Sequence, residues 1–159
     1  MNTEILKLLE NDARLTPEQI AVMLNCDCQD VRKIIDQSEK NGTILGYNTI
    51  VDWEKTDHES VTAMIEVKLT PQRDRGFDRV AEKIYNYPEV KSLLLMSGGF
   101  DLAVIVHGKT MLDIGNFVAR RLSPIEGVTS TATHFIMHKY KDNGIVYDRQ
   151  VKDERSNCN

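Results

Sequence analysis

The sequence of 159 residues predicts an α+β protein in which a helical N-terminal part precedes a part where strands and helices alternate. Three observations lead to this prediction. Helix start and stop signals recur at short intervals within residues 1–42. Residues 61–137 instead follow the order strand, helix, strand, strand, helix, strand. The polar and charged residues 52–60 separate the two patterns, so we expect a linker there.

The first predicted helix covers residues 3–10. Its apolar side chains recur with helical spacing, and Asn2 precedes them as a plausible cap. These side chains are Ile5, Leu6, Leu8 and Leu9. The helix is expected to end near residues 11–12.

Two further helices begin in quick succession. Thr16 and Gln19 have the spacing of a capping box, which predicts the start of the second helix. Asp27 can cap the third helix, and the pair Asn41-Gly42 can end it through a left-handed residue. Because only residues 25–27 separate these helices, the chain must turn sharply, as in a helix-turn-helix. Such helix pairs also occur without a role in DNA binding, and the pattern alone leaves both interpretations open.

Residues 44–51 are rich in strand-forming side chains around a glycine and an asparagine. This composition predicts a small wing, or a strand that leads away from the helices. We therefore expect one domain at residues 1–51, with residues 44–51 as either its wing or the strand that leaves it.

The second part predicts a ferredoxin-like domain. Apolar side chains alternate along residues 61–69, which is typical of a strand with one buried face. Helices are expected at 77–85 and 111–122 and further strands at 90–96, 100–106 and 128–137, with Gly98-Gly99 in a tight hairpin turn. The order βαββαβ predicts an antiparallel sheet with helices packed on one face. The other face needs a cover, and a second copy of the chain would supply it, so we expect a homodimer.

Composition narrows the classes of function. The net charge of −4 argues against avid nonspecific binding to nucleic acid, so any DNA binding must come from a local surface. No apolar run is long enough to cross a bilayer, and the N-terminus lacks the profile of a secretory signal. We expect a cytoplasmic protein without membrane contact.

We expect neither a metal nor a cofactor. Cys26 and Cys28 could form half of a metal site, but no second pair with zinc spacing accompanies them, and the alternative is that they pack in a helical turn. His134 and His138 are four residues apart, but a strand would separate them by over ~12 Å. The sequence contains neither a phosphate-binding loop nor a nucleophile elbow, so we do not expect an enzyme.

Several motifs resemble those of one family. They are Asp12-Ala13-Arg14-Leu15-Thr16, Glu39-x-x-Gly42-x-Ile44-x-Gly46-Tyr47, Ser97-Gly98-Gly99-Phe100-Asp101 and Pro124-x-x-Gly127-Val128. In their order and spacing, from about residue 2 to residue 139, they resemble the Lrp/AsnC (feast/famine) transcription regulators.

The resemblance implies a regulator of transcription that binds double-stranded DNA. It implies a winged helix-turn-helix at residues 1–51, and it implies that residues 61–139 bind a ligand and form a homodimer that assembles further, to a tetramer or an octamer. From the polar composition of the C-terminal end we expect residues 140–159 to form an arm and tail. An amino acid or similar small metabolite would bind between dimers and change assembly or DNA affinity. By this resemblance the effector site includes Ser97, Gly98, Gly99, Phe100, Asp101, Thr131 and Thr133.

The chemistry of these residues fits an amino acid. Gly98 and Gly99 would let the backbone approach the ligand, and the carboxylate of Asp101 would meet an ammonium group. The alternative is structural: two glycines between strands need no ligand, an aspartate is common after a turn, and threonines suit a strand surface.

The third helix offers the candidates for DNA contact. Arginine can bind guanine through two hydrogen bonds, glutamine can bind adenine in the same way, and lysine suits phosphate. The candidates are Gln29, Arg32, Lys33 and Gln37 for bases or phosphates and Lys40 for the backbone. Residues 1–42 nevertheless contain five Lys and Arg against eight Asp and Glu, a net charge of −3. Either binding is salt-sensitive and relies on cooperative assembly, or the helix-turn-helix has become a scaffold.

Two other functions remain open on the same architecture. One is an enzyme similar to the siroheme decarboxylases, which share this arrangement of domains with the regulators. The other is an amino-acid-binding oligomer that acts through protein partners and does not bind DNA. Because one fold hosts many functions, the fold alone does not choose among them.

Overall fold

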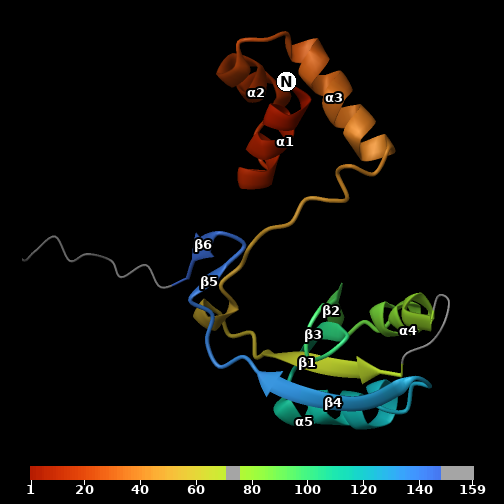
Figure 1. The fold of residues 1–159 in the computed structure, drawn as a ribbon. Helices are drawn as coiled ribbons and strands as arrows, with labels where there is room; N and C mark the ends of the chain where they lie inside the picture. Colours follow the sequence, from red (N-terminus) through yellow and green to blue (C-terminus); the bar gives the residue numbers. More distant parts are fainter. Residues whose placement is uncertain (71–75, 148–159) are drawn as a thin grey trace, which may run out of the picture. The chain divides into compact units, whose positions relative to one another are not determined.

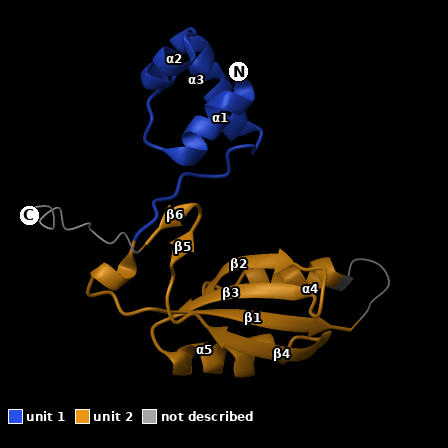
Figure 2. Cartoon of the chain, turned by 60° about the vertical axis from the view of Figure 1, so that its left-hand side comes forward, with its two compact units in different colours: residues 1–51 blue, residues 52–159 orange. Residues whose placement is uncertain are grey.

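The computed structural model describes residues 1–70 and 76–147. The chain divides into two compact units, residues 1–51 and residues 52–159 (Figure 2). Among the helices of the described residues, none has the length and apolar character needed to cross a membrane.

Unit 1 consists of three helices around a small core. They are α1 (Asn2–Asn11), α2 (Pro17–Leu24) and α3 (Cys28–Lys40) (Figure 1). Every helix contributes to the core, which contains Ile5, Leu9, Ile20, Ala21 and Val31. Cys26 and Cys28 pack against this core while half-buried, which is the structural role considered for them from the sequence.

Local signals set the ends of α2 and α3 as predicted, whereas the prediction that Asn2 caps the first helix is wrong, because Met1 is the N-cap of α1 and Asn2 lies within the helix. Thr16 accepts a hydrogen bond from the backbone N–H of Gln19, and the Gln19 side chain accepts one from the backbone N–H of Thr16, which completes the capping box. The carboxylate of Asp27 accepts a hydrogen bond of 2.6 Å from the backbone N–H of Gln29 at the start of α3. Gly42, with φ +74°, follows the last turn of α3. The helix-turn-helix predicted from these signals is present.

Residues 44–51, which the sequence predicts as a wing or a strand, carry no strand in the structure. A strand needs a partner for its backbone hydrogen bonds, and the rest of unit 1 is helical. Leu45 and Tyr47 are exposed in this segment, and the Tyr47 hydroxyl donates a hydrogen bond of 2.8 Å to Glu39 on α3. Residues 52–60, expected as a linker, are grouped with unit 2 and contain a short 3-10 helix, η1 (Trp53–Lys55).

Unit 2 has the predicted ferredoxin-like order. Its elements are β1 (Val61–Leu69), α4 (Gly76–Tyr85), β2 (Val90–Leu95), β3 (Leu102–Gly108), α5 (Met111–Phe117), the π-helical turn η2 (Val118–Leu122) and β4 (Val128–Phe135). The strands form one antiparallel sheet in the order β2-β3-β1-β4. The two long helices cover one face of it (Figure 1).

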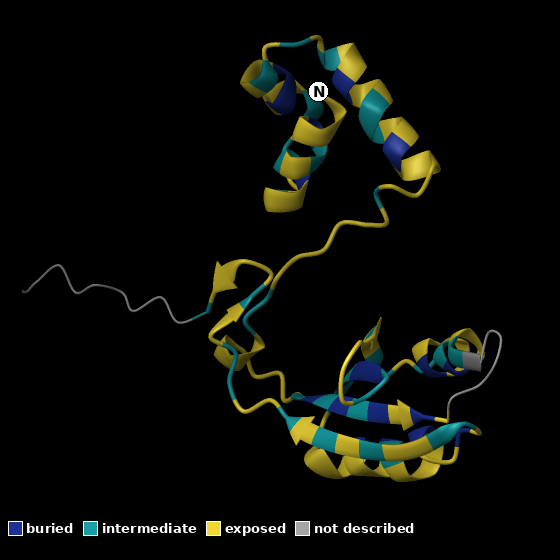
Figure 3. Ribbon diagram, in the orientation of Figure 1, coloured by how far each residue is buried: buried dark blue, intermediate teal, exposed yellow. Residues whose placement is uncertain are grey.

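The core of unit 2 lies between the sheet and its helices. Buried and less buried residues alternate along β1 (Figure 3). Ile65 and Val67 belong to the core, and because successive side chains of a strand alternate, Met64 and Glu66 face the opposite side of the sheet. Ile84 on α4 and Leu122 in η2 are fully buried against this sheet. The two faces of the sheet therefore differ in chemistry, and the helix-free face carries polar and apolar side chains together.

Two connections differ from the sequence-based expectation. The chain between β2 and β3 closes through a hydrogen bond from the Met96 N–H to the Asp101 carbonyl, so the loop holds four residues, 97–100, in place of a tight turn at Gly98-Gly99. After β4, residues 141–146 form a small hairpin, β5 (Lys141–Asp142) with β6 (Ile145–Val146). The predicted tail, from residue 148 on, lies outside the described residues.

Candidate DNA-binding helix and effector site

The outer surface of α3 gathers the polar side chains that the sequence offers for DNA contact. All five are exposed: Gln29, Arg32, Lys33, Gln37 and Lys40. Their spacings of three, four and eight residues place them on one side of the helix, away from the buried Val31. The geometry is that of a helix free to enter a groove.

Acidic side chains modify this surface. Arg32 forms an ion pair and hydrogen bond with Glu18 on α2, and the Lys33 ammonium lies 3.3 Å from the carboxylate of Asp30. Hydrogen bonds from its own backbone N–H and from Thr16, followed by the charge of Arg32, lower the pKa of Glu18, so this carboxylate is ionised at neutral pH. The Arg32 guanidinium is therefore already bound within unit 1.

Asp36 lies on the same side of α3, three residues after Lys33 and four before Lys40, and is exposed. A carboxylate there repels phosphate but can accept a hydrogen bond from cytosine N4 in a major groove. The surface is thus mixed in charge, as the composition of residues 1–42 predicts.

The loop between β2 and β3 is anchored through Asp101. Its carboxylate accepts a hydrogen bond of 2.7 Å from the backbone N–H of Leu69, and its own N–H donates to the carbonyl of Val67 at 3.0 Å. Both partners lie near the end of β1. One Asp101 oxygen therefore stabilises the fold, while the other accepts no hydrogen bond within the described residues.

The two glycines of this loop are not required by the chain itself. Gly98 and Gly99 are exposed, neither has a left-handed φ, and an added Cβ at either position would meet no atom within 4 Å. Ser97 is exposed beside them, and Phe100 is half-buried. Within residues 1–70 and 76–147, nothing explains the absence of side chains at these two positions.

Only one of the two predicted threonines lies at the same end of the sheet as this loop. Thr131 is paired with Val67, which is paired with Leu102 on its other side, whereas Thr133 is paired with Ile65 in the middle of β1. Their half-buried side chains share the helix-covered face, and the Thr131 hydroxyl lies 3.3 Å from that of Ser123. The register brings Thr131 to the level of Asp101, with β1 between them, and places Thr133 two residues further along β4.

The histidines of the last strand do not meet. His134 lies 3.2 Å from Glu66 on the helix-free face, whereas His138 lies 3.2 Å from Glu54. Within residues 1–70 and 76–147, no group of three or more His, Cys, Asp or Glu side chains is placed to hold a metal ion.

With this geometry known, the chain can be compared with other proteins. Residues 62–146 match the Lrp/AsnC ligand binding domain. The chain belongs to the Lrp/AsnC family. It is 47% identical over 154 residues to the uncharacterized HTH-type transcriptional regulator YugG of Bacillus subtilis, covering 96% of this chain and 93% of that protein. The match to YugG includes both units.

Solved structures share the Lrp/AsnC fold. AsnC of Escherichia coli superposes with a TM-score of 0.66 at 15% identity, over 87% of this chain and 91% of that one. The regulator NMB0573 of Neisseria meningitidis, solved with L-Met, gives a TM-score of 0.72 at 22% identity, over 89% and 90% of the two chains. Relatives of this Lrp/AsnC protein are thus helix-turn-helix transcriptional regulators, and their fold is the one described above.

One group of residues in this Lrp/AsnC protein was missed from the sequence. Trp53, His58, His107 and Lys91 come from separate segments, and the structure brings them to the rim of one hollow at the end of the sheet opposite the Asp101 loop. None of the predicted effector residues lines it. Little in the sequence indicated this group, because His58 and His107 are 49 positions apart and come together only through the pairing of β1 with β3.

Proposed function

We propose that this Lrp/AsnC protein is a sequence-specific, DNA-binding transcription regulator whose assembly or DNA affinity responds to an amino acid or a similar small metabolite. The observation that supports this most is the exposed polar side of α3 beyond the tight turn at residues 25–27. A second helix presented in this way can lie in the major groove while the first contacts the backbone. Gln29, Arg32, Lys33 and Gln37 would contact bases or phosphates, and Lys40 the backbone.

The acidic character of unit 1 makes each single contact weak. Arg32 must leave Glu18, and Lys33 must leave Asp30, before either can bind DNA fully. A homodimer or larger assembly compensates for this, because several linked helices bind with an effective concentration that one helix lacks. Binding is then strongly salt-dependent, since each released counterion contributes to affinity at low salt.

The helix-free face of the sheet supports the homodimer. It carries the half-buried Met64 and Ile105 together with Glu66 and His134, whose side chains lie 3.2 Å apart. A second sheet packed on this face would remove the apolar side chains from water and leave the polar ones paired.

The effector would bind at the Asp101 end of the sheet. The second oxygen of the Asp101 carboxylate can accept from the ammonium group of an amino acid, and the bare backbone at Gly98 and Gly99 gives the ligand room to approach. The loop is exposed in a single chain, so a neighbouring copy would close the site. The complex of the Neisseria meningitidis regulator with L-Met is consistent with an amino acid as the ligand of this fold.

The experiment combines two measurements on the full chain. Light scattering after size-exclusion chromatography, with and without a panel of amino acids, measures the mass of the assembly. A shift assay on the promoter of its own gene, from low to physiological salt, measures DNA binding. We expect one amino acid to change the mass and a specific shift that weakens steeply with salt.

The same experiment separates the other two functions. A change of mass with an amino acid but no DNA shift at any salt would indicate an oligomer that acts through protein partners. Incubation with siroheme tests the remaining function. Tight binding of siroheme together with loss of its carboxylate groups would show that the protein is an enzyme and not a regulator.

A further inference from the structure

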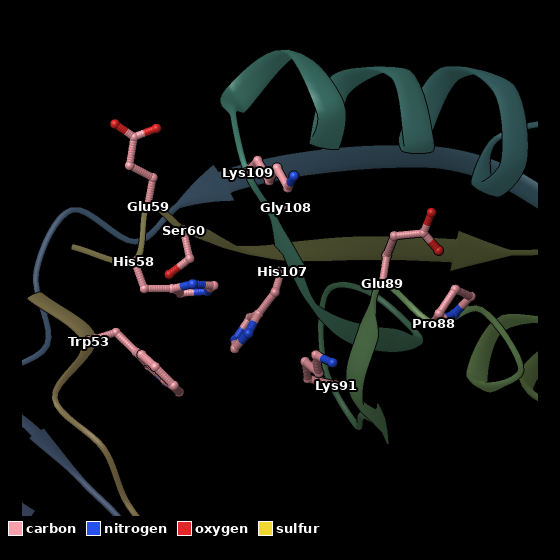
Figure 4. A pocket seen from close by; sticks show the side chains of 10 residues that line it. All are labelled: Trp53, His58, Glu59, Ser60, Pro88, Glu89, Lys91, His107, Gly108 and Lys109. Atoms are coloured by element: carbon pink, nitrogen blue, oxygen red, sulfur yellow. The ribbon is translucent and has the colours of Figure 1, made fainter. Parts of the chain in front are cut away.

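The hollow at the start of β1 is the second feature of unit 2 that could receive a ligand. It encloses about 580 Å³ and collects side chains from the segment after unit 1, the start of β2 and the end of β3. These are Trp53, His58, Glu59, Ser60, Pro88, Glu89, Lys91, His107, Gly108 and Lys109 (Figure 4). It is separate from the loop at residues 97–100, because Val61 and Val67 are six positions apart along β1, which corresponds to about 20 Å of strand.

One wall of the hollow is aromatic. The rings of Trp53 and His58 are 4.8 Å apart at a tilt of 49°, and the His107 ring turns toward the same space (Figure 4). Trp53 is 49% exposed in the single chain, which leaves a large flat apolar surface in water. A planar ring placed against it would bury that surface and stack on the indole.

The other wall is cationic. Lys91 and Lys109 line the hollow, and burial, followed by the charges of Lys139 and Lys91, lowers the pKa of His107. Burial is the largest cause of this shift, and only the smaller contributions of Lys139 and Lys91 reflect positive charge near the imidazole, in a chain whose net charge is −4.

The hollow also contains two carboxylates. Glu89 accepts a hydrogen bond of 2.7 Å from Arg121, whose guanidinium lies 5.7 Å from the centre of the Tyr87 ring. Glu59 points away from the space that the rings share (Figure 4). Glu89 is thus paired with Arg121 through one oxygen, while its other oxygen is buried and has no hydrogen-bond partner among the described residues.

We propose that this hollow is a second ligand site, and that it binds a small anion carrying a planar ring. Aromatic carboxylates and nucleoside monophosphates share this chemistry. The ring stacks against Trp53 and His58, and the anionic group binds the ammonium of Lys91. Because Trp53 and His58 belong to the segment that follows unit 1, the ligand fixes this segment against the sheet.

Trp53 is the single tryptophan of the chain and reports directly on the site. The full-length protein is titrated with benzoate and with adenosine monophosphate, while inorganic phosphate serves as the anion without a ring. Tryptophan fluorescence and calorimetry are measured in parallel. We expect at least one ring-bearing anion to give a saturable change in both signals, at concentrations at least about tenfold below those needed for phosphate. Tighter binding of benzoate would indicate that the natural ligand is an aromatic carboxylate, and tighter binding of adenosine monophosphate would indicate a nucleotide.

Variants assign the binding to the hollow. Lys91→Ala is expected to lower the affinity for the ring-bearing anion about tenfold or more, because a charged hydrogen bond is lost. The matched control is Lys68→Ala, which removes the same charge from an exposed position near the other end of β1. Lys68→Ala and Asp101→Asn are both expected to leave the affinity unchanged.

Three results would overturn the proposal. The first is that neither ring-bearing anion gives a saturable signal at concentrations up to ~10 mM. A dissociation constant above this concentration would be too weak for the binding of a metabolite. The second is an affinity that Lys91→Ala leaves unchanged or that Lys68→Ala lowers equally. The third is loss of binding in Asp101→Asn, which would assign the ligand to the loop at residues 97–100.

Discussion

Arg32 on α3 is held by Glu18 on α2 through an ion pair between the two helices of the helix-turn-helix. Both side chains are about half exposed, so the pair is accessible to solvent and to DNA. Exposed pairs of this kind contribute little to stability, and this one opposes DNA binding because the guanidinium must exchange one partner for another.

Replacing Glu18 with Gln should therefore strengthen DNA binding. The variant releases Arg32 and removes one negative charge close to the phosphates. We expect a gain of a few fold in affinity, largest at low salt, because screening weakens the effect of the lost charge. A salt series of shift assays measures it. Glu10→Gln on α1 is the matched control, and equal gains in the two variants would show that only the net charge matters.

The signals that predicted unit 1 are local, which is why they could be found in the sequence. Thr16, Asp27 and Gly42 act on backbone groups within a few residues, and each does so in the structure. The ion pair of Arg32 with Glu18 joins residues 14 positions apart. This ion pair depends on how α2 and α3 pack against each other. The composition of residues 1–42 therefore predicted an acidic surface but could not predict which residues pair.

Asp101 allows its two roles to be separated by two substitutions. Asn keeps an oxygen that can accept from the Leu69 N–H, so Asp101→Asn should fold normally and lose the response to the effector. Asp101→Ala leaves that N–H without its partner, and we expect it to lower the free energy of unfolding by about 1–3 kcal/mol. Chemical denaturation and the mass change with amino acid measure the two effects. A full response to the effector in Asp101→Asn would remove this carboxylate from the site.

Gly98→Ala should affect the ligand and not the fold. An added Cβ meets no atom within 4 Å, and the backbone there is not left-handed, so alanine is expected to leave stability unchanged or raise it by up to about 1 kcal/mol. The same methyl group would occupy the space through which the ligand approaches. We expect weaker binding of the effector, measured by calorimetry. Unchanged effector binding would favour the structural interpretation of this loop.

The difference between the predicted and observed connections has a physical reason. Alternation along β1 predicted its buried face, because burial of every second residue is a property of one strand. The loop at residues 97–100 and the segment at 44–51 depend instead on partners that sequence patterns do not specify. The bond of Asp101 to Leu69 spans 32 positions, and the hollow joins His58 to His107, so both arise from the register of the sheet.

His107 predicts how stability depends on pH. Burial, followed by Lys139 and Lys91, holds its pKa below the ordinary value of 6.5, so below about pH 6.5 the unfolded chain takes up a proton that the folded protein resists. The free energy of unfolding should therefore fall as the pH drops from about 6.5 to 5. In His107→Gln this fall should be shallower. The two proteins are compared by denaturation at each pH, relative to pH 8, where the imidazole is neutral in both states. Parallel curves would contradict the assignment.

The central claim is that the exposed side of α3 binds DNA, and one measurement tests it most directly. The affinity for the promoter of its own gene is measured at low salt for the unmodified protein, for Arg32→Ala, and for Lys7→Ala, which removes one exposed positive charge from α1 in the same unit. We predict that Arg32→Ala binds about 5- to 100-fold more weakly, as expected for the loss of a base or phosphate contact of 1–3 kcal/mol, while Lys7→Ala stays close to the unmodified protein. Equal affinity for Arg32→Ala and the unmodified protein, or an equal loss in both variants, would contradict it.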